Sequence, residues 1–182
     1  MIGERRSLAD FSRLGLVIAV LVRAVLWSTL FIGFVLMFVP ASILAAAGIR
    51  APNPFGSWQI AGLGLGLIGM VLAVTCIAVF AFVGRGTPAP FDPPRRLVAV
   101  GPYRLIRNPM YVGAWLLIVG LALFYRSGGM ALYAIVFLAI AHAFVVAYEE
   151  PMLRRTFGPQ YLDYCQTTGR WWPTRGRRGG RS

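Results

Sequence analysis

The chain contains no lysine, a single histidine, two cysteines and only six acidic residues in 182 positions. Charged residues make up 13% of it, whereas about a quarter of an average soluble domain is charged. Cys76 lies in an apolar segment and Cys165 in a basic one, and their spacing is not that of metal ligands. We therefore expect no disulfide and no metal site. The sequence also shows no nucleophile triad and no phosphate-binding loop.

Apolar residues dominate instead, at 58% of the chain with a mean hydropathy of +0.68. They occur in blocks, and a helix needs about 20 apolar residues to cross a bilayer. The composition therefore predicts an all-α integral membrane protein with one membrane domain.

The blocks predict about four transmembrane helices. The first apolar run, Leu14–Val39, is interrupted by Arg23, so either Leu14–Val22 is interfacial or one long tilted helix carries a snorkelling Arg23; the span ends around residues 40–47. The second span is Trp58–Val83. Two shorter runs, Met110–Tyr125 and Met130–Tyr148, are separated by four turn residues and predict a tight helical hairpin.

All 18 basic residues are arginine, giving a formal net charge of +12. So basic a chain raises nucleic acid as a partner, but the arginines lie at the ends of apolar blocks and in the tail, where they would meet anionic headgroups. We expect no nucleic-acid binding. The N-terminal stretch, loop 84–108 and the C-terminal region hold most of the arginine, which places both termini and this loop in the cytoplasm.

Three regions follow from this pattern. Residues 1–83 form the N-terminal transmembrane helices, with the first run retained as a signal anchor. Residues 84–173 form a core that contains the proline-rich loop and the hairpin, and residues 174–182 form a disordered arginine-rich tail. The exclusive use of arginine indicates a bacterium with a GC-rich genome, and hence a bacterial inner membrane.

Four glycines, Gly62, Gly64, Gly66 and Gly69, lie in the first half of the second span. Glycine lets a neighbouring helix or a ligand approach the backbone closely. Helix packing is the favoured interpretation.

Two polar clusters flank the predicted hairpin, residues 101–113 at its entry and residues 148–155 at its exit. A hairpin brings its ends together, so arginines and carboxylates should meet at the membrane surface. Glu149 and Glu150 are expected at a helix end, where one could bind a ligand while the other forms an ion pair. The alternative is that both pair with nearby arginines: Arg104, Arg107, Arg154 and Arg155.

His142 lies seven residues before Glu149, on nearly the same helix face. An ionisable residue at membrane depth is a functional candidate. The alternative is a neutral histidine hydrogen-bonded within the helix bundle.

Several motifs occur in order: GTPAPFDPPRR at 86–96, GPYR at 101–104, RNPMYVG at 107–113, YEEP at 148–151, FGPQY at 157–161 and RWWP at 170–173. Together they resemble the superfamily of isoprenylcysteine carboxyl methyltransferases and phospholipid methyltransferases. The resemblance covers roughly residues 84–173 and implies S-adenosylmethionine as cofactor, in a pocket formed by the proline-rich loop and the C-terminal region. Its loop often has histidine where this chain has Asn108, an asparagine that cannot titrate.

Carried over by position, the resemblance implies a catalytic role for Arg107, Asn108 and Glu150. It further implies that the cofactor is bound by Tyr103, Arg104, Pro109, Tyr111, Glu149 and Glu150, to which we add His142 for its position. Arginine suits the cofactor's carboxylate, and glutamate suits its ammonium or ribose hydroxyls.

The methyl acceptor is expected to be lipophilic and to enter from the bilayer. An isoprenylcysteine-type carboxylate, a phospholipid amine and a small hydrophobic metabolite all remain open, with a preference for a lipid or small hydrophobic acceptor. Two other functions stay open: a sterol-type reductase that uses NADPH, and a small membrane scaffold or transporter. The shortness of the chain disfavours the first, and the gathering of polar motifs on one face disfavours the second.

Overall fold

The structure, a computed structural model, describes residues 32–52, 55–80 and 97–174, together with positions 22, 26, 29, 30 and 83. Its elements are π-helical η1 (Ile32–Phe38), α2 (Val39–Ala46), α3 (Ser57–Val79), the 3₁₀ turn η3 (Gly101–Arg104), α4 (Pro109–Tyr125), α5 (Gly128–Phe144), π-helical η4 (Val145–Glu149), α6 (Glu150–Phe157) and α7 (Pro159–Thr167). Across these described ranges the fold is helical, and the only strand-like pairing is one backbone bridge between Ile106 and Gly169.

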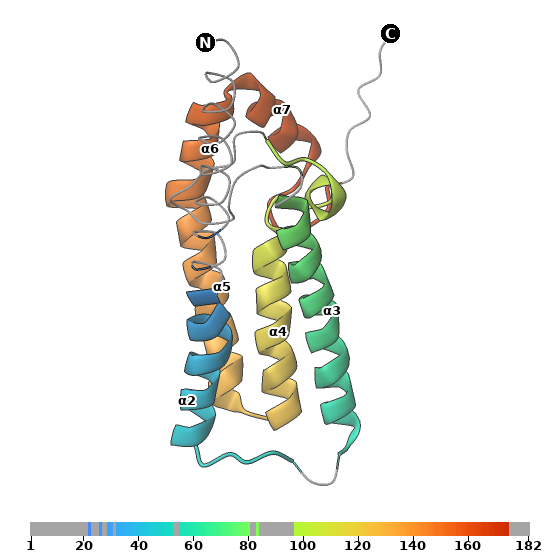
Figure 1. Cartoon of the computed structure of the whole chain (residues 1–182), viewed down its shortest axis with the longest axis vertical. Coiled ribbons are helices and arrows are strands. Elements are labelled where there is room, and N and C mark those ends of the chain that lie inside the picture. Colours follow the sequence, from blue (N-terminus) through green and yellow to red (C-terminus); the bar gives the residue numbers. More distant parts are fainter. Residues whose placement is uncertain are drawn as a thin grey trace, which may run out of the picture.

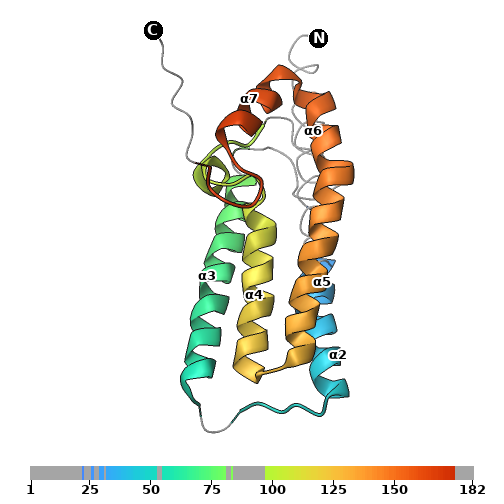
Figure 2. The same ribbon diagram turned by 180° about the vertical axis from the view of Figure 1, so that it is seen from behind.

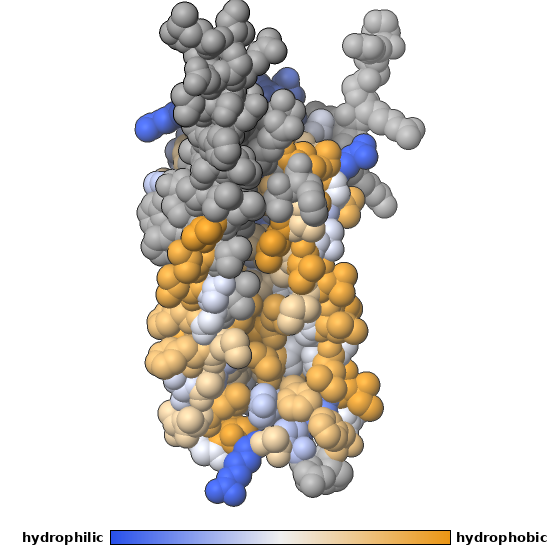
Figure 3. Space-filling model, viewed as in Figure 1, coloured by the Kyte–Doolittle hydropathy of each residue, from blue (hydrophilic) through white to orange (hydrophobic). Residues whose placement is uncertain are grey.

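The long helices lie side by side and the polar elements gather at one end (Figures 1 and 2). The α2–α3 connection and the α4–α5 turn lie at one end of the bundle, while η3, α6 and α7 lie at the other. Apolar side chains cover the visible flank between the two ends (Figure 3). In the described part, two helices are long and apolar enough to cross a membrane, Ser57–Val79 and Gly128–Phe157, and two shorter apolar helices accompany them. The chain is a membrane protein.

Helices α3 and α4 are in direct backbone contact through glycines. A Cβ added at Gly62 would lie 2.6 Å from the carbonyl oxygen of Gly120, and one added at Gly69 would lie 2.6 Å from that of Gly113. The two pairs are seven residues apart on each antiparallel helix. The packing interpretation of the glycines is therefore confirmed at Gly62 and Gly69, whereas a Cβ at Gly64 would meet nothing.

The predicted hairpin is confirmed in α4 and α5. Arg126 adopts a left-handed conformation (φ 50°) at the end of α4, and the hydroxyl of Ser127 accepts a hydrogen bond from the Met130 N–H at 3.3 Å. These two residues reverse the chain within a single turn, since α5 already begins at Gly128.

The prediction that this helix ends near Tyr148 is wrong. The chain stays helical through η4 and α6 to Phe157, giving 30 continuous residues, or about 45 Å at 1.5 Å per residue. Pro151 does not end the helix, because the wider π-helical turns of η4 immediately precede it and it occupies the first turn of α6. Glu149 and Glu150 consequently lie inside a helix rather than at its end.

Of the first predicted span, the structure describes mainly the second half, from residue 32 onward. Helix α2 ends at Ala46, within the expected exit region, and Pro40 lies in its first turn, where proline is tolerated. The Tyr133 hydroxyl on α5 donates a hydrogen bond to the Val35 carbonyl at 2.9 Å, which joins η1 to the hairpin. Apart from Val22, the residues on which the alternatives for Leu14–Val22 and Arg23 depend lie outside the described residues, as do the loop 84–96 and the tail from residue 175.

The backbone contact between α3 and α4 makes Gly69→Ala a destabilising substitution. The added methyl group has backbone atoms as neighbours and cannot be accommodated by a side-chain rotation. We expect a loss of about 1 to 3 kcal/mol, typical of overpacking, measured as a lower melting temperature of the protein in detergent. Gly64→Ala is the matched control on the same helix and should leave the melting temperature unchanged or raise it; equal effects of the two substitutions would contradict the packing.

Candidate functional site

A short segment near the C-terminus, Gly169–Trp171, joins the entry of α4 to the long helix; we call it the C-terminal strap. The Arg107 backbone N–H donates a hydrogen bond to the Gly169 carbonyl at 2.8 Å. The Asn108 side-chain amide, which is buried, donates to the Arg170 carbonyl at 3.2 Å. The strap is thus held against the residues that precede α4 by its own backbone.

Glu150 is the centre of an ion cluster at the polar end of the bundle. It is only 4% exposed and receives two hydrogen bonds from the Arg170 guanidinium, at 2.7 and 2.9 Å. Nη1 of Arg107 lies 3.1 Å from the same carboxylate, and Arg154, one helical turn along α6, reaches it at 3.8 Å. We call Glu150 with these three arginines the arginine cluster.

Arg107 has further contacts that the sequence did not predict. Its Nη1 lies 2.7 Å from the sulfur of Cys165 and 3.5 Å from the Tyr161 hydroxyl, both on α7. Its Nε is buried and has no hydrogen-bond partner among the described residues. Three arginines surround one glutamate in this cluster, so it carries an excess of positive charge that favours a bound anion.

Two tyrosines at the same end of the bundle, Tyr103 and Tyr164, are held in the neutral form. The Tyr164 hydroxyl donates a hydrogen bond to the Tyr103 carbonyl. Burial is the main cause that raises the pKa of Tyr103 and of Tyr164 above the usual value. Both phenols therefore act as hydrogen-bonding groups and packing surfaces at neutral pH.

A second set of side chains links α4 to α5, and we call it the aromatic bridge. The Tyr111 hydroxyl donates a hydrogen bond to Glu149 at 3.1 Å, and the Tyr111 ring meets the Trp171 ring edge to face at 6.4 Å. The Trp171 indole N–H donates to Nδ1 of His142 at 3.0 Å. The strap therefore contributes Arg170 to the arginine cluster and Trp171 to the aromatic bridge.

The structure brings most of the predicted site residues together. Arg107, Asn108 and Glu150 meet at the strap and the arginine cluster, Pro109 is the buried first residue of α4, and Tyr111, Glu149 and His142 form the aromatic bridge.

Two predicted residues lie apart from these sets. Tyr103 is buried against α3, with its ring 5.3 Å from that of Phe80 and its hydroxyl bonded to the Cys76 side chain. Arg104 is exposed in η3 and belongs neither to the arginine cluster nor to the aromatic bridge. Of the four arginines proposed as partners for the glutamates, the structure pairs Arg107 and Arg154 with Glu150.

Arg170 and Trp171 belong to the C-terminal RWWP motif, but nothing in the sequence paired them with Glu150 and His142. The contacts of Tyr161 and Cys165 were likewise missed, because helix α7 was not predicted.

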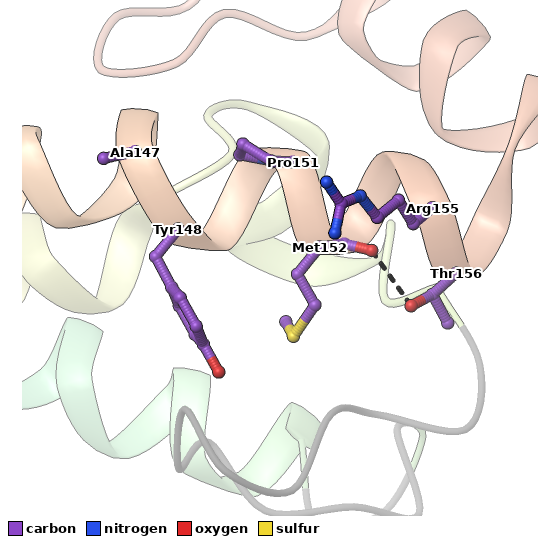
Figure 4. A pocket seen from close by; sticks show the side chains of 6 residues that line it. All are labelled: Ala147, Tyr148, Pro151, Met152, Arg155 and Thr156. Atoms are coloured by element: carbon purple, nitrogen blue, oxygen red, sulfur yellow. Dashed lines mark hydrogen bonds between the residues drawn. The ribbon is translucent and has the colours of Figure 1, made fainter.

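A cavity of about 290 Å³ lies along one face of η4 and α6. It is lined by Ala147, Tyr148, Pro151, Met152, Arg155 and Thr156. Tyr148 and Met152 point to the same side of the helix, and Thr156 is tied back to the Met152 carbonyl at 2.9 Å (Figure 4). Its lining is apolar apart from the tyrosine hydroxyl, Arg155 and Thr156, and includes no residue of the arginine cluster.

The geometry of the arginine cluster predicts that its arginines contribute unequally to the stability of the folded protein. Arg170→Met should destabilise the protein by about 1.5 to 3 kcal/mol, because it removes the charge-assisted hydrogen bonds of the bidentate partner, while Arg107 still compensates the buried carboxylate. Arg154→Met is the matched control: its side chain is 55% exposed, and an exposed pair contributes about 0 to 1 kcal/mol. Thermal unfolding in detergent, followed by tryptophan fluorescence, measures both. A similar loss in the two variants would show that Glu150 does not depend on Arg170.

Comparison with known proteins gives one curated relative, the nickel-cobalt-cadmium resistance protein NccN of Alcaligenes xylosoxydans xylosoxydans. It is 34% identical over 77 residues, which cover 42% of this chain and 36% of the relative. The chain therefore aligns with about a third of the length of that protein. No solved structure matches the chain.

The sequence of residues 58–160 matches the family described as phospholipid methyltransferase. This range begins in α3, includes α4, α5 and α6, and ends in the first turn of α7. It contains both polar clusters and covers more than half of the chain. The chain belongs to the phospholipid methyltransferase family.

Proposed function

We propose that the protein transfers a methyl group from S-adenosylmethionine to a lipophilic acceptor at the cytoplasmic face of a bacterial inner membrane. The family match carries this proposal, because residues 58–160 include the helices that bring Arg107 next to Glu150. The acceptor classes are those expected above: an isoprenylcysteine-type carboxylate, a phospholipid amine or a small hydrophobic metabolite.

The residues of the site suit this cofactor. S-adenosylmethionine carries a carboxylate, an ammonium group and ribose hydroxyls. The excess positive charge of the arginine cluster and the buried Nε of Arg107, which lacks a partner among the described residues, support Arg107 as the group that binds the carboxylate. The Tyr111 and Trp171 rings offer stacking surfaces for adenine.

The two adjacent glutamates have different surroundings, which supports different roles. Glu150 is bonded to three arginines, so we assign it the role of a positioning residue that orients Arg107. Glu149 accepts a hydrogen bond from Tyr111 and is the better candidate for binding the ammonium group or a ribose hydroxyl.

When bound, the cofactor supplies an electrophilic methyl group. The protein then has to align the acceptor with that group and to exclude water, and such positioning accounts for most of the catalysis. The strap and the aromatic bridge hold the residues of the proposed cofactor site in place. These residues come from three parts of the chain: the entry of α4, helix α5 and the C-terminal segment.

The arrangement in the membrane follows from length and charge. Four apolar helices are present in the described residues, two of full spanning length and two shorter. With the polar end of the bundle in the cytoplasm, the cofactor enters from the aqueous side and the acceptor from the bilayer. Both termini are then cytoplasmic.

Cofactor binding tests the proposal directly. We expect S-adenosylmethionine to bind the detergent-purified protein in titration calorimetry, and NADPH not to bind. Arg107→Lys keeps the charge but loses the fork geometry, so affinity should fall about tenfold to a hundredfold, the loss of one charge-assisted contact.

Asp163→Asn is the control, because Asp163 is exposed on α7 and lies outside both residue sets. Its affinity should equal that of the wild type, and the melting temperatures of all variants show that each is folded. Binding of NADPH in place of S-adenosylmethionine would support a reductase. Absence of binding of either cofactor to the folded wild type would support a scaffold or transporter.

A further inference from the structure

His142 is the only histidine of the chain, and its ring is fixed by a residue of the strap. The Trp171 indole N–H donates a hydrogen bond to its Nδ1 at 3.0 Å, and the two ring centres are 6.1 Å apart. His142 itself remains exposed on α5. One edge of the imidazole is therefore engaged and the opposite edge is accessible.

The partner of Nδ1 determines where the histidine carries its proton. An indole N–H is a donor only, so Nδ1 must be the acceptor. A neutral imidazole that accepts at Nδ1 carries its hydrogen on Nε2. The accessible edge of His142 therefore presents an N–H donor and, in this tautomer, no basic nitrogen.

The position of His142 along α5 separates it from the arginine cluster. It lies 14 residues beyond Gly128, or about 21 Å, which is within a hydrocarbon layer of roughly 30 Å. Glu149 lies seven residues further, about 10 Å closer to the polar end. A group that binds to His142 therefore lies deeper in the membrane than one bound at Glu149 or Arg107.

The surface around His142 is apolar. Ile135 on α5, one heptad before it, is 66% exposed, and Val146 in η4, four residues after it, is 41% exposed. Exposed apolar side chains therefore flank His142 along the helix on both sides. An N–H donor in such a position is stabilised when a ligand supplies an oxygen as hydrogen-bond acceptor, because a polar group without a partner in hydrocarbon is costly in free energy.

We propose that His142 binds the methyl acceptor by donating its Nε2–H to an oxygen of the acceptor's head group, and that Trp171 is a positioning residue that fixes the required tautomer. This inference rests on the proposed function and deepens it. The acceptor is then a lipid whose head group carries a carboxylate, phosphate or carbonyl oxygen and whose chain lies along α5. His142 does not act as the base that takes a proton from the acceptor.

Nuclear magnetic resonance of protein labelled with ¹⁵N-histidine tests the tautomer without any need for activity, since the chain gives a single imidazole. We expect Nε2 to be protonated in the wild type. Trp171→Phe keeps a ring but removes the donor, so it should produce a mixture of tautomers. Trp172→Phe, at the neighbouring position that is 78% exposed, is the matched control and should leave the spectrum unchanged. A proton on Nδ1 in the wild type, or identical spectra for the two variants, would overturn the inference.

Two probes test the binding role and distinguish the sources of the oxygen: N-acetyl-S-farnesylcysteine, which carries a carboxylate, and phosphatidylethanolamine in mixed micelles. We expect one of them to shift the Nε2 signal. His142→Leu should weaken binding of that probe about tenfold to a hundredfold, and it should weaken S-adenosylmethionine binding no more than Trp171→Phe does, because both variants remove the same hydrogen bond between Trp171 and His142. His142→Gln, which keeps an N–H donor, should retain part of the probe affinity.

A loss of cofactor affinity in His142→Leu that exceeds the loss in Trp171→Phe, or a signal unmoved by both probes, would overturn the acceptor role. Failure of the proposed function is distinct, because it shows as absence of S-adenosylmethionine binding to the wild type whatever the tautomer of His142.

Discussion

The polar end of this protein depends on one buried carboxylate. Glu150 is 4% exposed, and a charge so far from water is stable only when opposite charges surround it. Its partners come from the segment before α4, from α6 and from the strap, so three segments that are distant in sequence are fixed at one point. The strap backbone, the Asn108 side chain and the Trp171 indole make their hydrogen bonds next to this ion cluster, because Arg170 lies between Gly169 and Trp171.

The membrane part supplies the fixed platform for this cluster. In lipid there is little hydrophobic drive between helices, so close packing of small residues has to hold α3 and α4 together. Gly62 and Gly69 allow their backbones to touch Gly120 and Gly113, and the second contact lies one helical turn from Asn108 and Pro109. The position of the segment before α4, which carries Arg107, is thus fixed relative to α3 by residues that carry no charge.

Much of this architecture could be predicted from the sequence. Apolar blocks and turn residues predicted the hairpin, and the spacing of the glycines predicted that α3 packs closely against another helix, because both features depend on local composition. The continuation of the helix past Pro151 could not be predicted, since it requires the π-helical turn of η4. The pairing of Glu150 with Arg170 could not be predicted either, because several chemically equivalent arginines lie near that end of the chain. Only the folded backbone of the strap determines which of them reaches Glu150.

The difference between the adjacent glutamates follows from helix geometry. Consecutive helical residues point about 100° apart, so Glu149 and Glu150 face different neighbours. The Glu150 side chain points toward the strap, where its oxygens accept hydrogen bonds from Arg170. The Glu149 side chain points toward Tyr111 at the entry of α4. A residue that holds the site together must keep its partners when a ligand arrives, whereas a residue that binds the ligand must have an oxygen to offer. In the proposed function this argument assigns the first task to Glu150 and the second to Glu149.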